Sequence, residues 1–235
     1  MVLSVFLCFG LGCKPDKQAE SAKPTLPPTE PAAKVPSPAA EKSAQPSIEE
    51  SKPAAVPQPT IPGLPEDAWV VELKTSKGDI LLALDHKSAP ITVQNFVQYV
   101  QDGFFDGTIF HRVIKGFMIQ GGGFTPNLQQ KPTRAPIINE ASNGLQNLRG
   151  SISMARTQNP NSATAQFFIN HVNNANLDFV KGSNPGYAVF GSVLKGMEVV
   201  DAIASVATTT KGVFQNVPVE PVTINSAKVL QQPKP

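Results

Sequence analysis

The sequence predicts a mainly β domain: an antiparallel barrel whose ends are capped by two α-helices. Short apolar segments bounded by turn residues indicate about eight strands, two in a hairpin over 69–85 and the others at 109–113, 118–121, 151–155, 167–170, 188–194 and 222–230. Two further segments have the apolar spacing of helices. Strands this short and numerous, without alternating βαβ units, favour an antiparallel barrel.

Each element rests on its own pattern. In "WVVELKTSKGDILLALD" apolar and polar residues alternate on both sides of a Ser-Lys-Gly-Asp turn, which is typical of a hairpin. The first helix is predicted from the apolar positions Ile91, Val93, Phe96, Val97 and Val100, with Pro90 in its first turn and Gly103 as its stop. The second is predicted from Met197, Val200 and Ile203. Side chains just fill the interior of an eight-stranded barrel, so we expect a binding site on its outer wall or rim.

Composition divides the chain into parts. The folded domain is predicted at 66–232, followed by a short tail at 233–235. Residues 14–65 hold 13 of the 23 prolines and no aromatic residue, which indicates a disordered Pro-rich linker.

The first thirteen residues, "MVLSVFLCFGLGC", form an apolar run too short to span a bilayer, which is typical of a secretory signal. Its ending, Leu11-Gly12-Cys13, resembles a bacterial lipoprotein signal, in which the cysteine is lipidated. The run lacks a preceding Lys or Arg, and Gly10 stands where leucine is usual. The expectation is an exported, periplasmic protein anchored to the cell envelope by lipid on Cys13; the alternative is an uncleaved apolar N-terminus. Lys14, which is not acidic, suggests an outer-membrane destination.

Several classes of chemistry are excluded or disfavoured. Both cysteines, Cys8 and Cys13, precede the domain, which excludes cysteine chemistry there. The net charge of +2 comes without a basic cluster among aromatics, so no nucleic-acid partner is expected. The sequence predicts no cofactor and no metal, because His86 and His171 have no carboxylate or cysteine pattern around them.

The segment "FHRVIKGFMIQGGGF" brings a cation close to apolar residues. Arg112, Met118 and Gln120 share one strand face, and Gly116 allows a break that brings Phe117 beside them. These four side chains are expected to border one shallow site. The alternative for this stretch alone is a half-exposed strand on which the arginine covers the methionine.

Three long segments carry a family resemblance: "FDGTIFHRVIKGFMIQGG", "GSISMARTQNPNSATAQFFIN" and "GYAVFGSVLKGMEVVDAI". In order and separation they resemble the signature segments of cyclophilin-type peptidyl-prolyl cis-trans isomerases, most of all the bacterial periplasmic ones. The resemblance covers Trp69 to Leu230. It implies a closed eight-stranded barrel with two capping helices and a peptide groove on the outer surface.

The resemblance also implies the roles of individual residues. Arg112 matches the catalytic arginine. The pocket for the substrate proline ring matches Phe117, Met118, Phe168 and Leu177, and the residues that hold the peptide match Gln120, Ala155, Arg156 and Gln166. Tyr187 stands where the best-known eukaryotic members have histidine, and Asn176 where they have tryptophan. Weak cyclosporin binding is therefore expected, with Phe179 as a partial substitute for the lost ring.

These residue types suit the isomerisation of an X-Pro bond, which breaks no covalent bond. Twisting the amide costs about 18–20 kcal/mol and restores a lone pair to the proline nitrogen. A donor aimed at that nitrogen binds the transition state selectively. Arg112 suits this role because Gln120 can fix its planar fork while another N–H points at the substrate.

The predicted function is therefore an isomerase that acts on proline-containing segments of unfolded or folding envelope proteins. One alternative is a catalytically weak, chaperone-like peptide-binding lipoprotein; another, a purely structural lipoprotein, is disfavoured. His111 is interpreted as a structural histidine on the strand face opposite Arg112, and Gly121-Gly122-Gly123 as close backbone packing.

Overall fold

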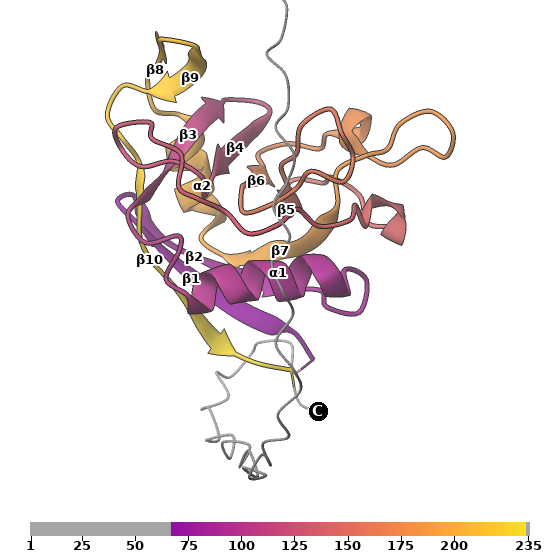
Figure 1. Cartoon of the computed structure of the whole chain (residues 1–235). Coiled ribbons are helices and arrows are strands. Elements are labelled where there is room, and N and C mark those ends of the chain that lie inside the picture. Colours follow the sequence, from indigo (N-terminus) through magenta and orange to yellow (C-terminus); the bar gives the residue numbers. More distant parts are fainter. Residues whose placement is uncertain (1–66, 234–235) are drawn as a thin grey trace, which may run out of the picture. The chain divides into compact units, whose positions relative to one another are not determined.

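The barrel closes through eight antiparallel strands in a computed structural model that describes residues 67–233 (Figure 1). The order around the barrel is β1-β10-β3-β4-β6-β5-β7-β2. Its strands are β1 (Trp69–Thr75), β2 (Gly78–Leu84), β3 (Thr108–Ile114), β4 (Met118–Gly121), β5 (Ser151–Met154), β6 (Phe167–Asn170), β7 (Val189–Lys195) and β10 (Thr223–Gln231). The predicted barrel and all eight of its strands are confirmed.

The barrel interior is filled by alternate residues of the strands. In β2, Ile80, Leu82 and Leu84 are fully buried, and the residues between them are partly exposed. In β6, Phe167 and Ile169 belong to the core cluster. The residue between them, Phe168, therefore faces the outer side of the barrel, because side chains alternate along a strand.

Both predicted helices pack into this core. In α1 (Pro90–Gln101) the proline takes the first turn, and the chain leaves the helix just before Gly103, which has a φ of 63°. Phe96 of this helix lies 5.0–5.5 Å, between ring centroids, from the rings of Phe105, Phe167 and Phe190. In α2 (Met197–Ala204), Val200 and Ile203 are fully buried.

The α1 N-terminus is capped by a distant carboxylate. Glu140 accepts hydrogen bonds from the backbone N–H groups of Ile91 and Thr92 at 3.2 and 2.7 Å. A negative charge at this end of a helix is favourable, because the first N–H groups have no partner inside the helix.

A small hairpin was not predicted. Strands β8 (Thr208–Lys211) and β9 (Phe214–Pro218) pair with each other beside β3 and outside the barrel. The β8 segment "TTTK" contains no apolar residue, and three of its four residues are exposed, so no apolar alternation marks the strand. Its run of β-branched threonines, followed by Gly212, is a signal from which the hairpin could have been predicted. Two short 3-10 helices, η1 (Ala141–Asn143) and η2 (Ala175–Leu177), lie in the loops.

The predicted signal at 1–13, the lipidated Cys13 and the linker at 14–65 lie outside the described residues and stay predictions. No helix within residues 67–233 combines the length and apolar character needed to cross a membrane.

Candidate functional site

Four neighbouring strands place side chains from distant parts of the sequence in one row on the barrel wall. Arg112 of β3 is paired with Gln120 of β4, and Gln120 in turn with Phe168 of β6. Phe168 is paired with Ser153 of β5, which leads into Ala155. Directly paired residues lie on the same face of a sheet, so this register alone brings the predicted cation, amide and aromatic ring together.

The turn between β3 and β4 supplies two walls. Gly116 has a φ of 75°, in the left-handed region that favours glycine. The chain reverses here, with the N–H of Phe117 donating to the carbonyl of Ile114 at 3.0 Å. Phe117 and Met118 are therefore presented to the same pocket although they are neighbours in sequence.

The resulting pocket has a volume of about 130 Å³. It is lined by Arg112, Phe117, Met118, Gln120, Ala155, Arg156, Phe168, Leu177 and Tyr187. All nine were predicted from the sequence. The apolar floor is well covered, since Met118 is 2 % and Phe168 4 % exposed. A floor of this kind accepts a small apolar ring, and polar groups on its rim can orient what is bound.

The tenth predicted residue, Gln166, stands behind the lining. Its side-chain oxygen accepts a hydrogen bond from Gln120 Nε2 at 3.0 Å. The prediction that Gln120 fixes the guanidinium of Arg112 is wrong for this structure, because Gln120 donates to Gln166 instead. Gly123 packs directly against Gln166, because a Cβ added to Gly123 would lie only 2.5 Å from Cγ of Gln166. The interpretation of the triple glycine as close packing is confirmed here.

Arg112 has donors free for a ligand. Within residues 67–233 its guanidinium makes no hydrogen bond and no ion pair. Its central carbon lies 6.0 Å from the centroid of the Phe117 ring, at the outer limit of a cation–π contact. A half-buried, uncompensated cation beside an apolar pocket binds lone pairs and partial negative charge strongly, since little water competes for it.

An aromatic wall closes the other side of the pocket. The Tyr187 ring meets the Phe168 ring edge-on, with 5.6 Å between centroids. Arg156 lies over the Tyr187 ring and donates from Nε and one terminal nitrogen to the Gly186 carbonyl at 3.0 and 2.9 Å. No sequence pattern indicates that this carbonyl takes part in the site, because every backbone carbonyl can accept a hydrogen bond.

His111 is buried, which fits its interpretation as a structural histidine, but it does not lie on the predicted strand face. A bulge in β3 between Phe110 and Arg112 puts both Phe110 and Val113 into the core cluster. His111 lies on the outer side with Arg112, its ring 4.6 Å from that of Phe124. Burial, together with the nearby positive charge of Arg112, lowers the pKa of His111 from its ordinary 6.5 to about 4. The side chain is therefore neutral at physiological pH.

Of the two positions that depart from the family pattern, Tyr187 lines the pocket and Asn176 does not. Asn176 is exposed, and its carbonyl accepts a hydrogen bond from Asn184 Nδ2 at 3.0 Å. Phe179, expected as a partial substitute for the missing ring, is 41 % exposed and does not line the pocket. Its backbone packs against Gly186 instead. A Cβ added to Gly186 would lie only 2.6 Å from the Phe179 backbone nitrogen.

Comparisons with known proteins show which family the chain resembles. A family model described as "Cyclophilin type peptidyl-prolyl cis-trans isomerase/CLD" matches residues 70–229. The chain is 58% identical to the peptidyl-prolyl cis-trans isomerase A of Dickeya dadantii over 162 residues, covering 69% of this chain and 85% of the relative. It is 54% identical to the isomerase B of Escherichia coli, covering 68% and 99% of the two chains.

Solved structures include a similar fold. The crystal structure of a Cryptosporidium parvum cyclophilin-type isomerase, determined in the presence of the dipeptide Ala-Pro, matches with a TM-score of 0.59 and 27% identity. The match covers 68% of this chain and 98% of that one.

Proposed function

We propose that in this chain, which belongs to the cyclophilin-type peptidyl-prolyl cis-trans isomerases, Arg112 is the catalytic residue and segments of unfolded or folding envelope proteins are the substrate. The isomerase activity itself follows from the family. The catalytic residue and the clients are the proposal.

The single observation that carries the role of Arg112 is its unpaired guanidinium on the rim of the apolar pocket. A planar X-Pro amide offers its oxygen but not its nitrogen, whose lone pair is delocalised. The lone pair returns as the bond twists, so an N–H donor beside that nitrogen gains a hydrogen bond only in the transition state. Each ~1.4 kcal/mol of such preference accelerates the reaction tenfold.

The pocket supplies the rest of the mechanism. Phe117, Met118, Phe168 and Leu177 would enclose the proline ring, exclude water and so strengthen the contact with Arg112. The similar Cryptosporidium parvum structure was determined with Ala-Pro, a ligand of the expected class. The reaction transfers no proton and breaks no covalent bond, which is consistent with a neutral, buried His111.

The test compares full-length protein with its Arg112→Ala and Arg112→Lys variants on an X-Pro tetrapeptide at low temperature. We expect Arg112→Ala to lower kcat by a factor of ~100 or more with a smaller effect on KM, as for the loss of a donor to a transition state. Lysine should restore little, because it lacks the planar fork. Arg134→Ala is the matched control, since Arg134 pairs with Asp102 away from the pocket. A kcat within twofold of wild type in Arg112→Ala would remove Arg112 from the mechanism.

The clients follow from the proposed location. Lipid on Cys13 and a linker of 52 residues would hold the domain within roughly 40 Å of a membrane on average, where exported chains fold. Globomycin-sensitive processing and membrane fractionation test this, with Cys13→Ser as the control. An unacylated protein in the soluble fraction would exclude the anchor while leaving the isomerase chemistry intact.

A further inference from the structure

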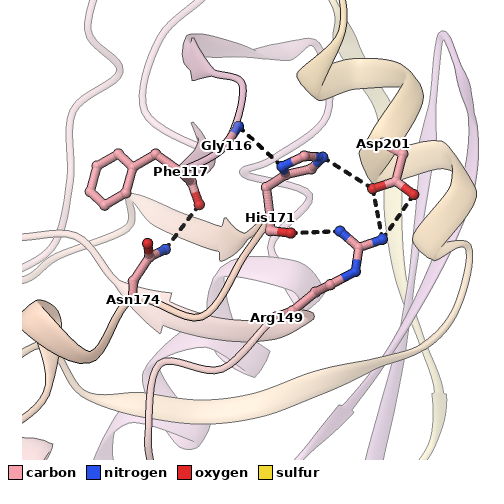
Figure 2. Close-up of polar contacts among 6 residues, drawn as sticks. All are labelled: Gly116, Phe117, Arg149, His171, Asn174 and Asp201. Carbon is pink, nitrogen blue, oxygen red and sulfur yellow. Dashed lines mark hydrogen bonds and ion pairs between the residues drawn. The ribbon is translucent and has the colours of Figure 1, made fainter.

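The segment that follows β6 is hydrogen-bonded to the β3–β4 turn, which carries Phe117 (Figure 2). The Gly116 N–H donates to His171 Nδ1 at 3.2 Å. In return, the Phe117 carbonyl accepts from the backbone N–H of His171 at 3.0 Å and from Asn174 Nδ2 at 2.9 Å. Three hydrogen bonds thus hold two consecutive residues of the turn, although neither His171 nor Asn174 lines the pocket.

The Gly116 bond determines the tautomer of His171. A backbone N–H can only donate, so Nδ1 must present its lone pair, and in the neutral ring the hydrogen is then on Nε2. Figure 2 shows Nε2 directed at Asp201, with Oδ1 at 3.2 Å. The carboxylate on α2 therefore selects the tautomer that can accept from the turn.

Arg149 in turn holds the carboxylate. One terminal nitrogen lies 2.9 Å from each oxygen of Asp201, and the other donates to the carbonyl of His171. An exposed ion pair of this kind stabilises a fold little by itself. Its geometry matters here because it fixes the oxygen that the imidazole faces, and the His171 side chain is only 15% exposed.

Packing does not hold the turn at Gly116. The residue is exposed, and a Cβ added to it would meet nothing within 4 Å. Its left-handed backbone is one of many conformations open to glycine, so a hydrogen bond is needed to select it. The next residue forms a wall of a pocket of only about 130 Å³, where a small shift of one ring changes the fit of a ligand.

We propose that His171 is a positioning residue: held in its acceptor tautomer by Asp201 and Arg149, it fixes the Gly116–Phe117 turn and so sets the affinity of the pocket for proline. This rests on the proposed function, in that the pocket takes the proline ring. The imidazole itself touches no substrate.

The experiment uses two substitutions of His171 in the full-length chain. Asparagine places its Oδ1 where Nδ1 of the histidine lies and keeps the acceptor for Gly116, whereas leucine has similar bulk and no acceptor. His86→Leu is the control, because His86 lies in another part of the surface, beside Trp69 and α1.

Nuclear magnetic resonance gives the first readout. The nitrogen shift of His171 Nδ1 in the wild type is expected to be that of an unprotonated nitrogen. The Gly116 amide should exchange about tenfold faster in His171→Leu than in the wild type, and near the wild-type rate in His171→Asn. A protonated Nδ1 at neutral pH, or equal exchange in the leucine and asparagine variants, would overturn the proposal.

Binding and turnover give the second readout. His171→Leu should raise KM, and the Kd of the dipeptide Ala-Pro, by about three- to tenfold with kcat within twofold, because a displaced wall weakens ground state and transition state alike. His171→Asn should keep KM and Kd near their wild-type values. If the leucine variant acted only by lowering the general stability of the fold, retaining the acceptor would not be expected to have this effect. Unchanged KM and Kd in His171→Leu would refute the positioning role. An inactive wild type would count against the proposed function. The role of His171 would still be decided in that case, because amide exchange and Ala-Pro binding do not depend on turnover.

Discussion

The guanidinium of Arg156 stacks over the ring of Tyr187, with its central carbon 4.3 Å from the ring centroid. Both residues line the pocket, and Arg156 also bonds twice to the carbonyl of Gly186, which directly precedes the tyrosine. The arginine therefore fixes both the ring and the backbone that carries it. This aromatic wall faces Arg112 across the pocket, so the two arginines serve different purposes.

Arg156→Ala should raise KM for a proline tetrapeptide by about three- to tenfold and change kcat less, because the Tyr187 wall loses both its cation–π contact and its anchored backbone. Arg156→Lys should recover only part of the loss, since an ammonium cannot reproduce the paired bonds to Gly186. Steady-state kinetics on both variants measure this. A fall in kcat alone, with KM unchanged, would mean that Arg156 acts in the transition state and not on the wall.

Gly123→Ala should disturb the site without touching a ligand. The new Cβ would lie 2.5 Å from Cγ and 2.8 Å from Cδ of Gln166, so that side chain must move and release Gln120. Losing one such hydrogen bond costs about 1 kcal/mol, or roughly a fivefold loss of kcat/KM. Gln166→Ala should have a similar effect, and the double variant should lose little more. Fully additive losses would show that the alanine acts elsewhere.

His111 should make stability depend on pH. Its folded pKa of about 4 lies below the ordinary value of 6.5, because burial disfavours the charged ring. The unfolded chain thus binds a proton between these values where the folded chain does not, and stability falls as pH drops from 6.5 towards 4. Between pH 7 and pH 4.5 the wild type should lose about 2 kcal/mol more than His111→Gln. Denaturant unfolding at the two pH values tests this, and equal losses would contradict it.

Asn176→Trp should strengthen cyclosporin binding. The side chain at this position is exposed beside Leu177 of the pocket, and its substitution leaves the backbone bond to Asn184 in place. An aromatic ring that covers the ligand would contribute roughly 1.5–3 kcal/mol, or about ten- to a hundredfold in Kd. Titration of wild type and variant measures the change, and turnover of a tetrapeptide should stay within about threefold. Equal affinities would mean that η2 does not present this position to the ligand.

Much of the site could be predicted from the sequence because its residues belong to three long family segments. Within those segments, strand periodicity already placed Arg112, Met118 and Gln120 on one face, and the pocket contains all three. The expectation that His111 lies opposite Arg112 failed for a local reason. A bulge inserts one residue into the strand, and no change in apolar pattern around "FHRV" marks it.

The eight barrel strands and the two α-helices could be predicted from local patterns, because side chains alternate along a strand and recur along a helix, and because turns need glycine and proline. Most side chains around the pocket were predicted from the family resemblance instead. The hydrogen-bond partner of each polar group depends instead on the packing of the folded barrel. Gln120 bonds to Gln166 and not to Arg112, and His171 reaches Gly116, because barrel closure brings β6 against β4. Hydrogen bonds depend on distances of a few ångströms between residues far apart in the chain, and the packed barrel is what sets those distances.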